Sequence, residues 1–424
     1  MIKAYKVRLY PNKTQAQYFA RAIGCCRKLY NLMLDDYKKA YSAYRAELEG
    51  LTDAEKKKYK FKYSPRYAQY ADIEEFSWMK EIEARARNYV QQNFKEGIKR
   101  FLDKKGAVGF PTHKKHMVAG SFQSDKMQIK GHKLKVPLCP GLVQFRNYGD
   151  IDFSKLKTKT ITISRTSNYK YYASILVENA PDEEPLPKTG KTIGIDINEF
   201  MVAVNDGRKL DRKSLNTDKK FFTGSRDPRT ENEKLHKLEE KIDFYERKLS
   251  RAGVWTTRTF TGKDGKEHVK RVLVQETGNY RRIKQKIANL NEKLVNVRRD
   301  FITKATKAIV PEADTIVMEG LKIATMLKDS ETKTNRQNGR THRNVLSSCM
   351  GMLGTKIAET ATKAGKTVIK VNPAYTTMTC HVCGQVRSIP IPLSKRKWTC
   401  CACGAELDRD VNAAKNILRR GVAT

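Results

Sequence analysis

The sequence lacks a long hydrophobic run. No stretch of about 18 apolar residues occurs, so no transmembrane helix is expected. The opening residues, MIKAYKVRLYP, carry charges where a secretory signal peptide would have its apolar segment. The chain also has no internal repeat and no long low-complexity tract. We therefore expect a protein without a membrane partner, located in the cytoplasm of a bacterium or archaeon and associated with the nucleoid.

Acidic residues are few relative to basic ones. The chain has 46 aspartates and glutamates against 84 lysines and arginines, which gives a formal net charge of +38. The excess is spread along the chain rather than confined to a tail. A polyanionic partner accounts for this charge better than solvation alone, and nucleic acid is the first expectation, with a membrane surface second. A length of 424 residues predicts about two or three domains.

The sequence also lacks a convincing Ser/His/Asp or Cys/His set for nucleophilic catalysis. Four of its cysteines instead form two C-x2-C pairs, the arrangement that binds structural Zn2+ with four thiolates. These four are Cys380, Cys383, Cys400 and Cys403. Two disulfides or four unrelated buried thiols are the alternatives, and a reducing compartment disfavours the disulfides. We expect one zinc ion, with Cys401 as a spare thiol and His381 as a surface residue.

The first part of the chain predicts strands around a helical insertion. Residues 1–11 alternate apolar and charged side chains, as in a half-buried strand. Apolar residues then follow helical spacing within 12–106, where a second helix is expected to begin near Ser77. Residues 107–179 change to short alternating runs that predict strands and hairpins. Together the strands predict a small β-barrel of the oligonucleotide-binding kind.

The rest of the chain predicts a second domain over 192–424. Residues 180–191 are rich in proline and acid and are expected to be the linker. Amphipathic patterns within 230–309 predict an antiparallel helical hairpin whose basic outer faces could line a nucleic-acid channel. A Gly- and Thr-containing loop or small hairpin, 251–278, interrupts it. The basic segment 322–345 has no periodicity and is expected to form a lid.

Three carboxylates lie in or next to predicted strands and helices of this domain. Asp196 lies inside an apolar strand, where a charge is costly unless it is paired or binds a metal. Glu319 follows another apolar strand, and Asp410 lies in the first turn of the last helix. Asp408 competes with Asp410 for the third position, although the helical register favours Asp410. A loop carboxylate is the alternative interpretation of Asp196.

Three carboxylates from separate elements have a chemical use together. They can hold two divalent cations about 3.5–4 Å apart. Oxygen ligands that must also bridge to phosphate favour Mg2+ or Mn2+. Such a site hydrolyses a phosphodiester by in-line displacement and requires no nucleophilic side chain, consistent with the missing catalytic sets.

Several motifs resemble the TnpB family, RNA-guided nucleases of insertion sequences that are similar to small type V CRISPR effectors. The motifs are KVRLYPNKTQ near the start, GID at Asp196, MEGL at Glu319, PAYTTMTCHVCG and DRDVNAAKNI. They cover nearly the whole chain in the family's order. The resemblance places the family's acids on Asp196, Glu319 and the second aspartate of DRD, Asp410.

The resemblance implies an α+β multidomain fold. A wedge barrel over 1–179 would carry a helical recognition insertion, and a RuvC-type RNase H-like domain would follow, with a zinc finger at 376–407. The chain departs from the family in reading GIDINEF where GIDLG is usual, in the 251–278 insertion, and in SSCMGML, which lacks the aromatic residue often found there. Because all three acids are present, we expect cleavage to be retained.

The resemblance also implies an activity and its partners. A guide RNA would pair with double-stranded target DNA next to a short flanking motif that the protein reads, and the protein would be a monomer in the RNA complex. The alternatives are an RNA-guided DNA-binding repressor without cleavage and a DNA-strand transferase, or transposase. A zinc-ribbon binding module would explain the cysteines but not the two strand acids.

Overall fold

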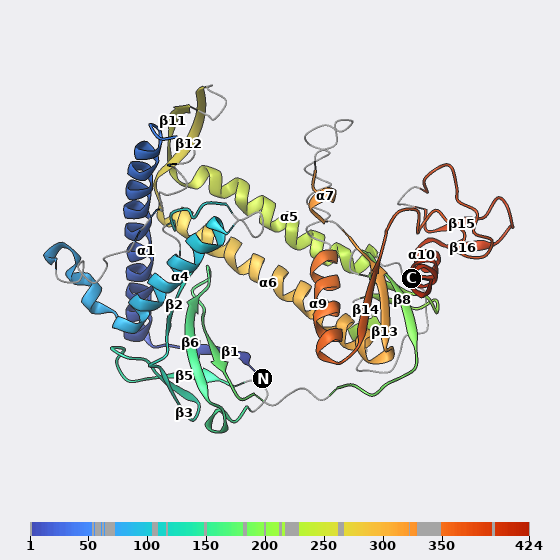
Figure 1. Cartoon of the computed structure of the whole chain (residues 1–424), viewed down its shortest axis with the longest axis horizontal. Helices are drawn as coiled ribbons and strands as arrows, with labels where there is room; N and C mark the ends of the chain where they lie inside the picture. Colours follow the sequence, from blue (N-terminus) through green and yellow to red (C-terminus); the bar gives the residue numbers. More distant parts are fainter. Residues whose placement is uncertain are drawn as a thin grey trace. The chain divides into compact units, whose positions relative to one another are not determined.

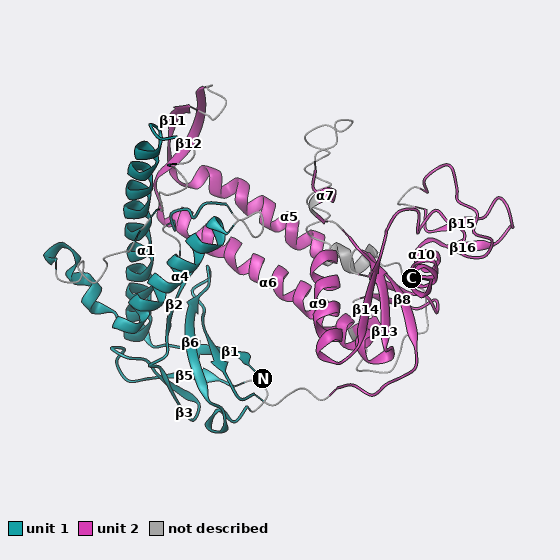
Figure 2. Ribbon diagram, in the orientation of Figure 1, with its two compact units in different colours: residues 1–182 teal, residues 183–424 magenta. Residues whose placement is uncertain are grey.

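The structure is a computed structural model. It describes residues 2–52, 55, 61, 63, 73–103, 109–115, 118–147, 151–180, 185–198, 201–211, 214–216, 229–261, 267–321, 323–328, 349–391 and 395–423. The chain divides into two compact units, Met1–Asp182 and Glu183–Thr424, and each is described by itself (Figure 2). Both units combine helices with sheets, so the expectation of an α+β chain is confirmed.

A seven-stranded sheet forms the body of the first unit. Its strand order is β2-β6-β7-β1-β5-β4-β3, and all neighbouring pairs are antiparallel. The strands are β1 (Lys3–Tyr10), β2 (Gly120–Ser124), β3 (Gln128–Lys130), β4 (Lys133–Lys135), β5 (Leu142–Arg146), β6 (Thr158–Arg165) and β7 (Tyr171–Val177). The strand expected within 1–11 is confirmed. Because the order begins with β2 and ends with β3, closure into a barrel stays a prediction.

Two long helices pack against this sheet. They are α1 (Lys13–Leu48) and α4 (Ala84–Leu102). Asn12 is the N-cap of α1: its side chain accepts from the Gln15 amide at 2.9 Å, while the Gln15 side chain accepts from the Asn12 amide at 3.1 Å. This reciprocal capping box satisfies two otherwise unpaired donors and explains why the chain turns from strand to helix there.

The prediction that the second helix begins near Ser77 is wrong. A 3-10 helix, η1 (Glu74–Glu81), occupies this region, and α4 begins only at Ala84. Ile82 separates them with an extended backbone, φ −116° and ψ 149°, and its side chain is buried. An apolar residue that fits the helical spacing is thus buried without belonging to the helix.

The second unit has a five-stranded sheet in the order β10-β9-β8-β13-β14. Its strands are β8 (Thr192–Asn198), β9 (Met201–Val204), β10 (Lys209–Asp211), β13 (Thr315–Glu319) and β14 (Thr367–Val371). Strands β8, β13 and β14 are parallel, whereas β9 and β10 add as antiparallel hairpins. The apolar strands expected around Asp196 and before Glu319 are therefore confirmed.

Helices cover both faces of this sheet (Figure 1). On one face α6 (Gly278–Ile309) and α9 (Met350–Lys363) bury Phe301 and Leu353 with Ile195 and Met318. On the other face lies α10 (Arg409–Val422), whose Ile417 is buried with Val317 and Val371. Successive residues of a strand point to opposite faces. Even-numbered residues of β8 and odd-numbered residues of β13 therefore face α10.

The helical hairpin of this unit contains a strand ribbon. Helix α5 (Arg229–Ala252) packs along α6, and Arg298 bonds Glu239 at 3.0 Å across the pair. Between them β11 (Val254–Thr261) pairs with β12 (Glu267–Gln275), which makes the interruption a hairpin rather than a loop.

The remaining short elements are η2 (Phe153–Lys155), η3 (Ser214–Asn216), η4 (Val310–Glu312), α7 (Ile323–Met326), β15 (Lys397–Thr399) and β16 (Glu406–Asp408). Most of the lid expected at 322–345 lies outside the described residues. So do residues 181–184 of the expected linker and residues 199–200 of the GIDINEF run.

Helix α10 approaches the sheet so closely that two contacts leave no room for a side chain. A Cβ at Gly194 of β8 would lie 2.4 Å from the Ala414 carbonyl oxygen and 2.6 Å from Leu418 Cβ. A Cβ at Gly421 of α10 would lie 2.3 Å from Val317 Cγ1. Glycine at these two positions therefore sets the distance between helix and sheet.

We expect Gly194→Ala to destabilise the second unit by about 2 kcal/mol or more, because the added methyl group overlaps backbone that cannot move alone. The matched control is Gly354→Ala in α9, where a Cβ would lie 3.6 Å from Ile197 Cδ1, an ordinary contact. Alanine there should be neutral or stabilising by up to about 1 kcal/mol. Thermal and urea unfolding measure both, and equal stability of the two variants would contradict the packing argument.

Candidate functional site

Two of the expected acids lie at the carboxyl ends of adjacent parallel strands. Strands β8 and β13 pair with Ile195 opposite Met318, so Asp196 and Glu319 follow at the same level and point to the same face. That face is the one covered by α10. Asp196 is only 5% exposed, and its Oδ2 accepts a hydrogen bond from Asn198 Nδ2 at 2.7 Å.

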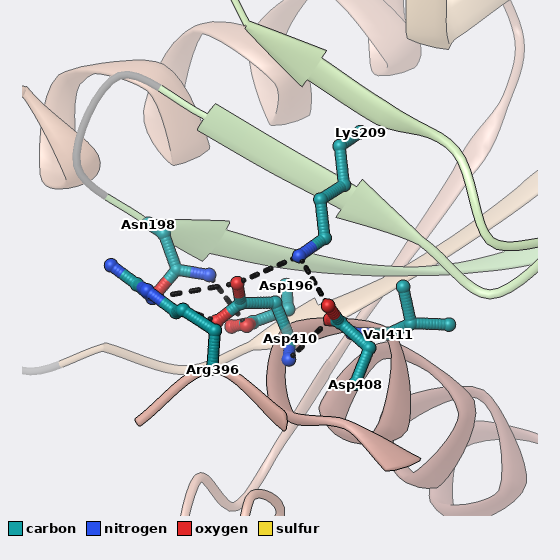
Figure 3. A network of polar contacts seen from close by, with 7 residues as sticks. All are labelled: Asp196, Asn198, Lys209, Arg396, Asp408, Asp410 and Val411. Carbon is teal, nitrogen blue, oxygen red and sulfur yellow. Dashed lines mark hydrogen bonds and ion pairs between the residues drawn. The ribbon is translucent and has the colours of Figure 1, made fainter. Parts of the chain in front are cut away.

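Helix α10 brings a third acid to this edge. Asp410, in its first turn, is 2% exposed, and both of its carboxylate oxygens face cations. Lys209 Nζ lies 3.2 Å from Oδ2, and Arg396 Nη1 lies 3.2 Å from Oδ1 (Figure 3).

Asp408 has a different task. It is the N-cap of α10, and its Oδ1 accepts from the backbone amides of Asp410 and Val411, both at 3.1 Å. Its Oδ2 accepts from Lys209 Nζ at 2.8 Å. Oδ1 of Asp408 is thus used in capping the helix, whereas neither oxygen of Asp410 has a capping role. Asp410 as the ligand acid stays a prediction.

Burial raises the pKa values of both strand acids, and repulsion by neighbouring acids adds to the shift of Asp196. Burial is the larger cause for Asp196, followed by the charges of Glu319 and Asp410, and together they raise its pKa to about 7. Burial likewise raises the pKa of Glu319, although a hydrogen bond from the Thr376 hydroxyl at 2.5 Å opposes this effect. The interactions show that the acids lie within electrostatic reach of one another. Acids held in this way fit an oxygen-ligand site for hard divalent cations.

Sequence reasoning missed the groups that surround these acids. Asn198 could have been found, because it shares the face of Asp196 two residues along the strand. Thr376 lies in the PAYTTMTCHVCG motif but carries no metal-ligand signature. Lys209 reaches the site only through the β9–β10 pairing, and Arg396 only through the fold of the segment before α10. No local sequence pattern indicates that Lys209 or Arg396 lies at the site.

The four expected cysteines form a cluster. Their sulfur atoms all lie within 4.8 Å of one another, with 3.8 Å between Cys380 and Cys403 and 3.6 Å between Cys383 and Cys400. Four sulfurs at about 2.3 Å from a central zinc ion would be about 3.8 Å apart, so the cluster fits a tetrahedral metal site. The backbone amides of Cys403 and Ala402 lower the pKa of the Cys400 thiol, which favours the thiolate form that binds metal.

The cysteine cluster is attached to α10 by buried amides. Asn412 Nδ2 and Asn416 Nδ2 donate to the Thr379 carbonyl at 2.8 and 2.7 Å, directly before Cys380. His381, expected at the surface, is half-buried. Its amide donates to Asn412 Oδ1 at 2.9 Å, and its Nε2 lies 3.2 Å from Lys415 Nζ. The cysteine cluster and Asp410 are therefore positioned by one helix.

Known families match three parts of the chain. The profile HTH_OrfB_IS605, "Helix-turn-helix domain", matches residues 1–46, which here hold β1 and the single helix α1. OrfB_IS605, "Probable transposase", matches residues 174–330, and "Cas12f1-like, TNB domain" matches residues 351–417, which include the cysteine cluster. The chain carries the domains of the TnpB family.

Curated proteins match the chain from end to end. A Streptomyces pristinaespiralis protein named "Putative RNA-guided DNA endonuclease" is 23% identical over 99% of this chain and 90% of its own length. "Putative RNA-guided DNA endonuclease InsQ" of Escherichia coli K12 is 24% identical over 100% and 93%. "CRISPR-associated DNA-binding protein Cas12m" of Allomeiothermus silvanus is 28% identical over 31% of the chain and 24% of its own length.

Among solved structures, a Cas12f1–sgRNA–target DNA complex aligns with 96% of this chain and 83% of its own chain, at a TM-score of 0.48 and 14% identity. None of the helices in the described part of the chain has the length and apolar character that a bilayer crossing requires.

Cys400→Ser should remove the bound metal, because three thiolates and a hydroxyl hold zinc far more weakly than four thiolates. Cys401→Ser is the matched control, since this neighbouring exposed thiol is outside the cluster. We expect about one metal equivalent per chain in the wild type and in Cys401→Ser by elemental analysis, with less metal and a lower melting temperature in Cys400→Ser. Full metal content in Cys400→Ser would contradict the cluster as a metal site.

The raised pKa of Asp196 gives a pH test in magnesium-free buffer. An acid whose pKa is higher in the folded state costs stability that grows as pH rises from about 4 to about 7 and is then constant. Asp196→Asn removes this loss, so it should stabilise the protein by roughly 1–4 kcal/mol at pH 8, with the gain shrinking towards pH 5.

The control is Asp206→Asn, which breaks favourable bonds from the Arg208 amide at 3.0 Å and Arg208 Nε at 2.7 Å and should not stabilise. Thermal unfolding across pH compares the two variants. A gain for Asp196→Asn that is the same at pH 5 and pH 8 would refute the electrostatic explanation.

Proposed function

We propose that this protein is an RNA-guided DNA endonuclease of a mobile element. Relatives with this name align over nearly its whole length. The observation that carries the proposal is the meeting of Asp196, Glu319 and Asp410, from three separate elements, at the carboxyl edge of one sheet. Ligand and catalytic sites of open α/β sheets lie at this edge. The net charge of +38 supports polyanionic partners.

The three acids would be the ligands of a two-metal RuvC-type site. Bound Mg2+ or Mn2+ would supply positive charge at the scissile phosphate and favour in-line displacement. The chain's own groups prepare this site: Asn198 and Thr376 orient the strand acids, and Lys209 and Arg396 balance the charge of Asp410. Cys380, Cys383, Cys400 and Cys403 would hold one structural Zn2+.

The domains follow the same proposal. Residues 1–179 would be the wedge with its recognition insertion at 12–106, and residues 192–424 the RuvC-type nuclease domain. The guide RNA would bind basic surfaces of the wedge and of the helical hairpin 230–309. Base pairing would read the target, while the protein would read a short motif in the flanking duplex, as one monomer per RNA.

Replacing single acids separates cleavage from binding. Asp196→Asn, Glu319→Gln and Asp410→Asn should each reduce DNA cleavage with Mg2+ at least about 100-fold, because each loses a group that acts on the reacting phosphate. RNA retention and target binding should persist. The assay uses protein purified from its native locus with its co-purifying RNA, and target DNA chosen from that RNA's sequence.

Glu312→Gln is the matched control, since Glu312 pairs with Arg208 outside the site. Wild-type binding without cleavage would favour a guided DNA-binding protein, the activity named for the Cas12m relative. Strand joining on the element's own ends without a co-purifying RNA would favour a transposase instead.

A further inference from the structure

The ribbon formed by β11 and β12 projects from the end of the α5–α6 helix pair (Figure 1). Within the described residues, its recorded contacts with the helix pair are at its base. Trp255 lies against Tyr280 with ring centroids 6.3 Å apart, and the Thr277 hydroxyl donates to the Ala252 carbonyl. Beyond the base, every described residue from 256 to 261 and from 267 to 271 is exposed.

Such a ribbon has no core of its own. An isolated two-stranded hairpin is marginally stable in water, and this one exposes both faces to solvent. Its strands nevertheless pair in register along most of their length, from Trp255 opposite Leu273 to Thr261 opposite Glu267. The outer ribbon contributes little to burying the unit's core, so packing does not explain which side chains it carries.

Strand alternation sorts these side chains into two faces. Arg271 lies over the Trp255 ring on one face at the base of the ribbon, and beyond the base the two faces differ. On the face without Arg271, Arg258 lies directly opposite Lys270, and Phe260 lies opposite His268. The Phe260 and His268 rings stack, with centroids 5.6 Å apart and planes 26° apart. Glu267, the only carboxylate among the described residues of the ribbon, is on the other face. We call the face with Arg258, Lys270, Phe260 and His268 the cation–aromatic face.

This face is unfavourable for the isolated protein. Like charges directly opposite in a strand pair repel and destabilise it. Phe260 is 49% exposed, so its ring is also largely in water. A partner that supplies anions beside flat apolar rings would relieve both costs. Phosphates joined to unpaired bases have this chemistry, because side-chain aromatics stack on splayed bases while arginine and lysine contact the backbone.

We propose that the cation–aromatic face binds a single-stranded segment of the protein's RNA. The inference rests on the proposed function, which supplies the RNA, and deepens it by naming a contact surface. Arg258 and Lys270 contact phosphates, and an unpaired base stacks on Phe260. A DNA duplex is the weaker fit, because its bases are already stacked inside the helix, although a β-ribbon can enter a major groove.

Matched variants on the two ribbon faces test the proposal. Arg258→Gln and Arg271→Gln remove the same charge from opposite faces, and Phe260→Ser and Val269→Ser remove exposed apolar side chains from opposite faces. The full chain, stripped of nucleic acid, is titrated with the RNA recovered from the wild type, transcribed and labelled, and with a DNA duplex of equal length. Circular dichroism and unfolding curves check that each variant is folded.

Phe260→Ser should weaken RNA binding about tenfold. Arg258→Gln should weaken it severalfold and reduce the slope of log affinity against log salt by about 0.7. Arg271→Gln and Val269→Ser should change the RNA affinity less than twofold. Equal losses on both faces, no loss on either face, or a larger loss for the duplex than for the RNA would overturn the assignment.

The outcome is separable from that of the proposed function. Cleavage guided by the wild-type RNA, together with unchanged RNA affinity in Arg258→Gln and Phe260→Ser, would reject the ribbon contact and keep the nuclease. If the wild type does not cleave but Arg258→Gln and Phe260→Ser alone lose RNA affinity, the ribbon contact is kept and the nuclease is rejected. Absence of any discrete co-purifying RNA would overturn both.

Discussion

The contact between α10 and the sheet of the second unit is the constraint on which the candidate site depends. Gly194 and Gly421 let helix and strands approach until backbone and side chains touch without an intervening Cβ. The same helix carries Asp410 at its start and, along its length, the amides of Asn412 and Asn416 that hold the chain before Cys380. A change in the distance between α10 and the sheet would therefore move the third acid and the cysteine cluster together.

The buried charge of Asp196 opposes folding. Asp196 is buried beside two other carboxylates, and its raised pKa measures how unfavourable its charge is there. The chain offsets this with Asn198, Thr376, Lys209 and Arg396, but only partly. The proposed divalent-cation site would need such uncompensated negative charge, so the same acids that bind the cations would lower the local stability. Asp408 and Asp410 have different roles: Asp408 caps the start of α10, and Asp410 faces the site.

The hydrophobic pattern predicted the elements well where burial is extensive, as continuous apolar runs in strands that are covered on both faces and as one apolar stripe on each long helix. The strands at 192–198 and 315–319 and the helices α5 and α6 lie close to where apolar spacing placed them. It failed at Ser77, where buried apolar residues at helical spacing belong to a 3-10 helix and an extended residue, because burial rather than backbone conformation produces the spacing. The segment 251–278 was ambiguous since both faces of its ribbon are exposed and leave a weak hydrophobic pattern.

The amino-acid sequence by itself determined the acids, the cysteine pairs, the charge and the family motifs, because these depend on residue identity and short spacing. Only the tertiary structure decided which groups meet. The parallel register of β8 and β13 places Asp196 beside Glu319, and the close contacts at Gly194 and Gly421 allow α10 to approach the sheet. The β9–β10 hairpin delivers Lys209, and strand register gives the ribbon its two faces. Such juxtapositions join residues far apart in the chain, and no local pattern encodes them.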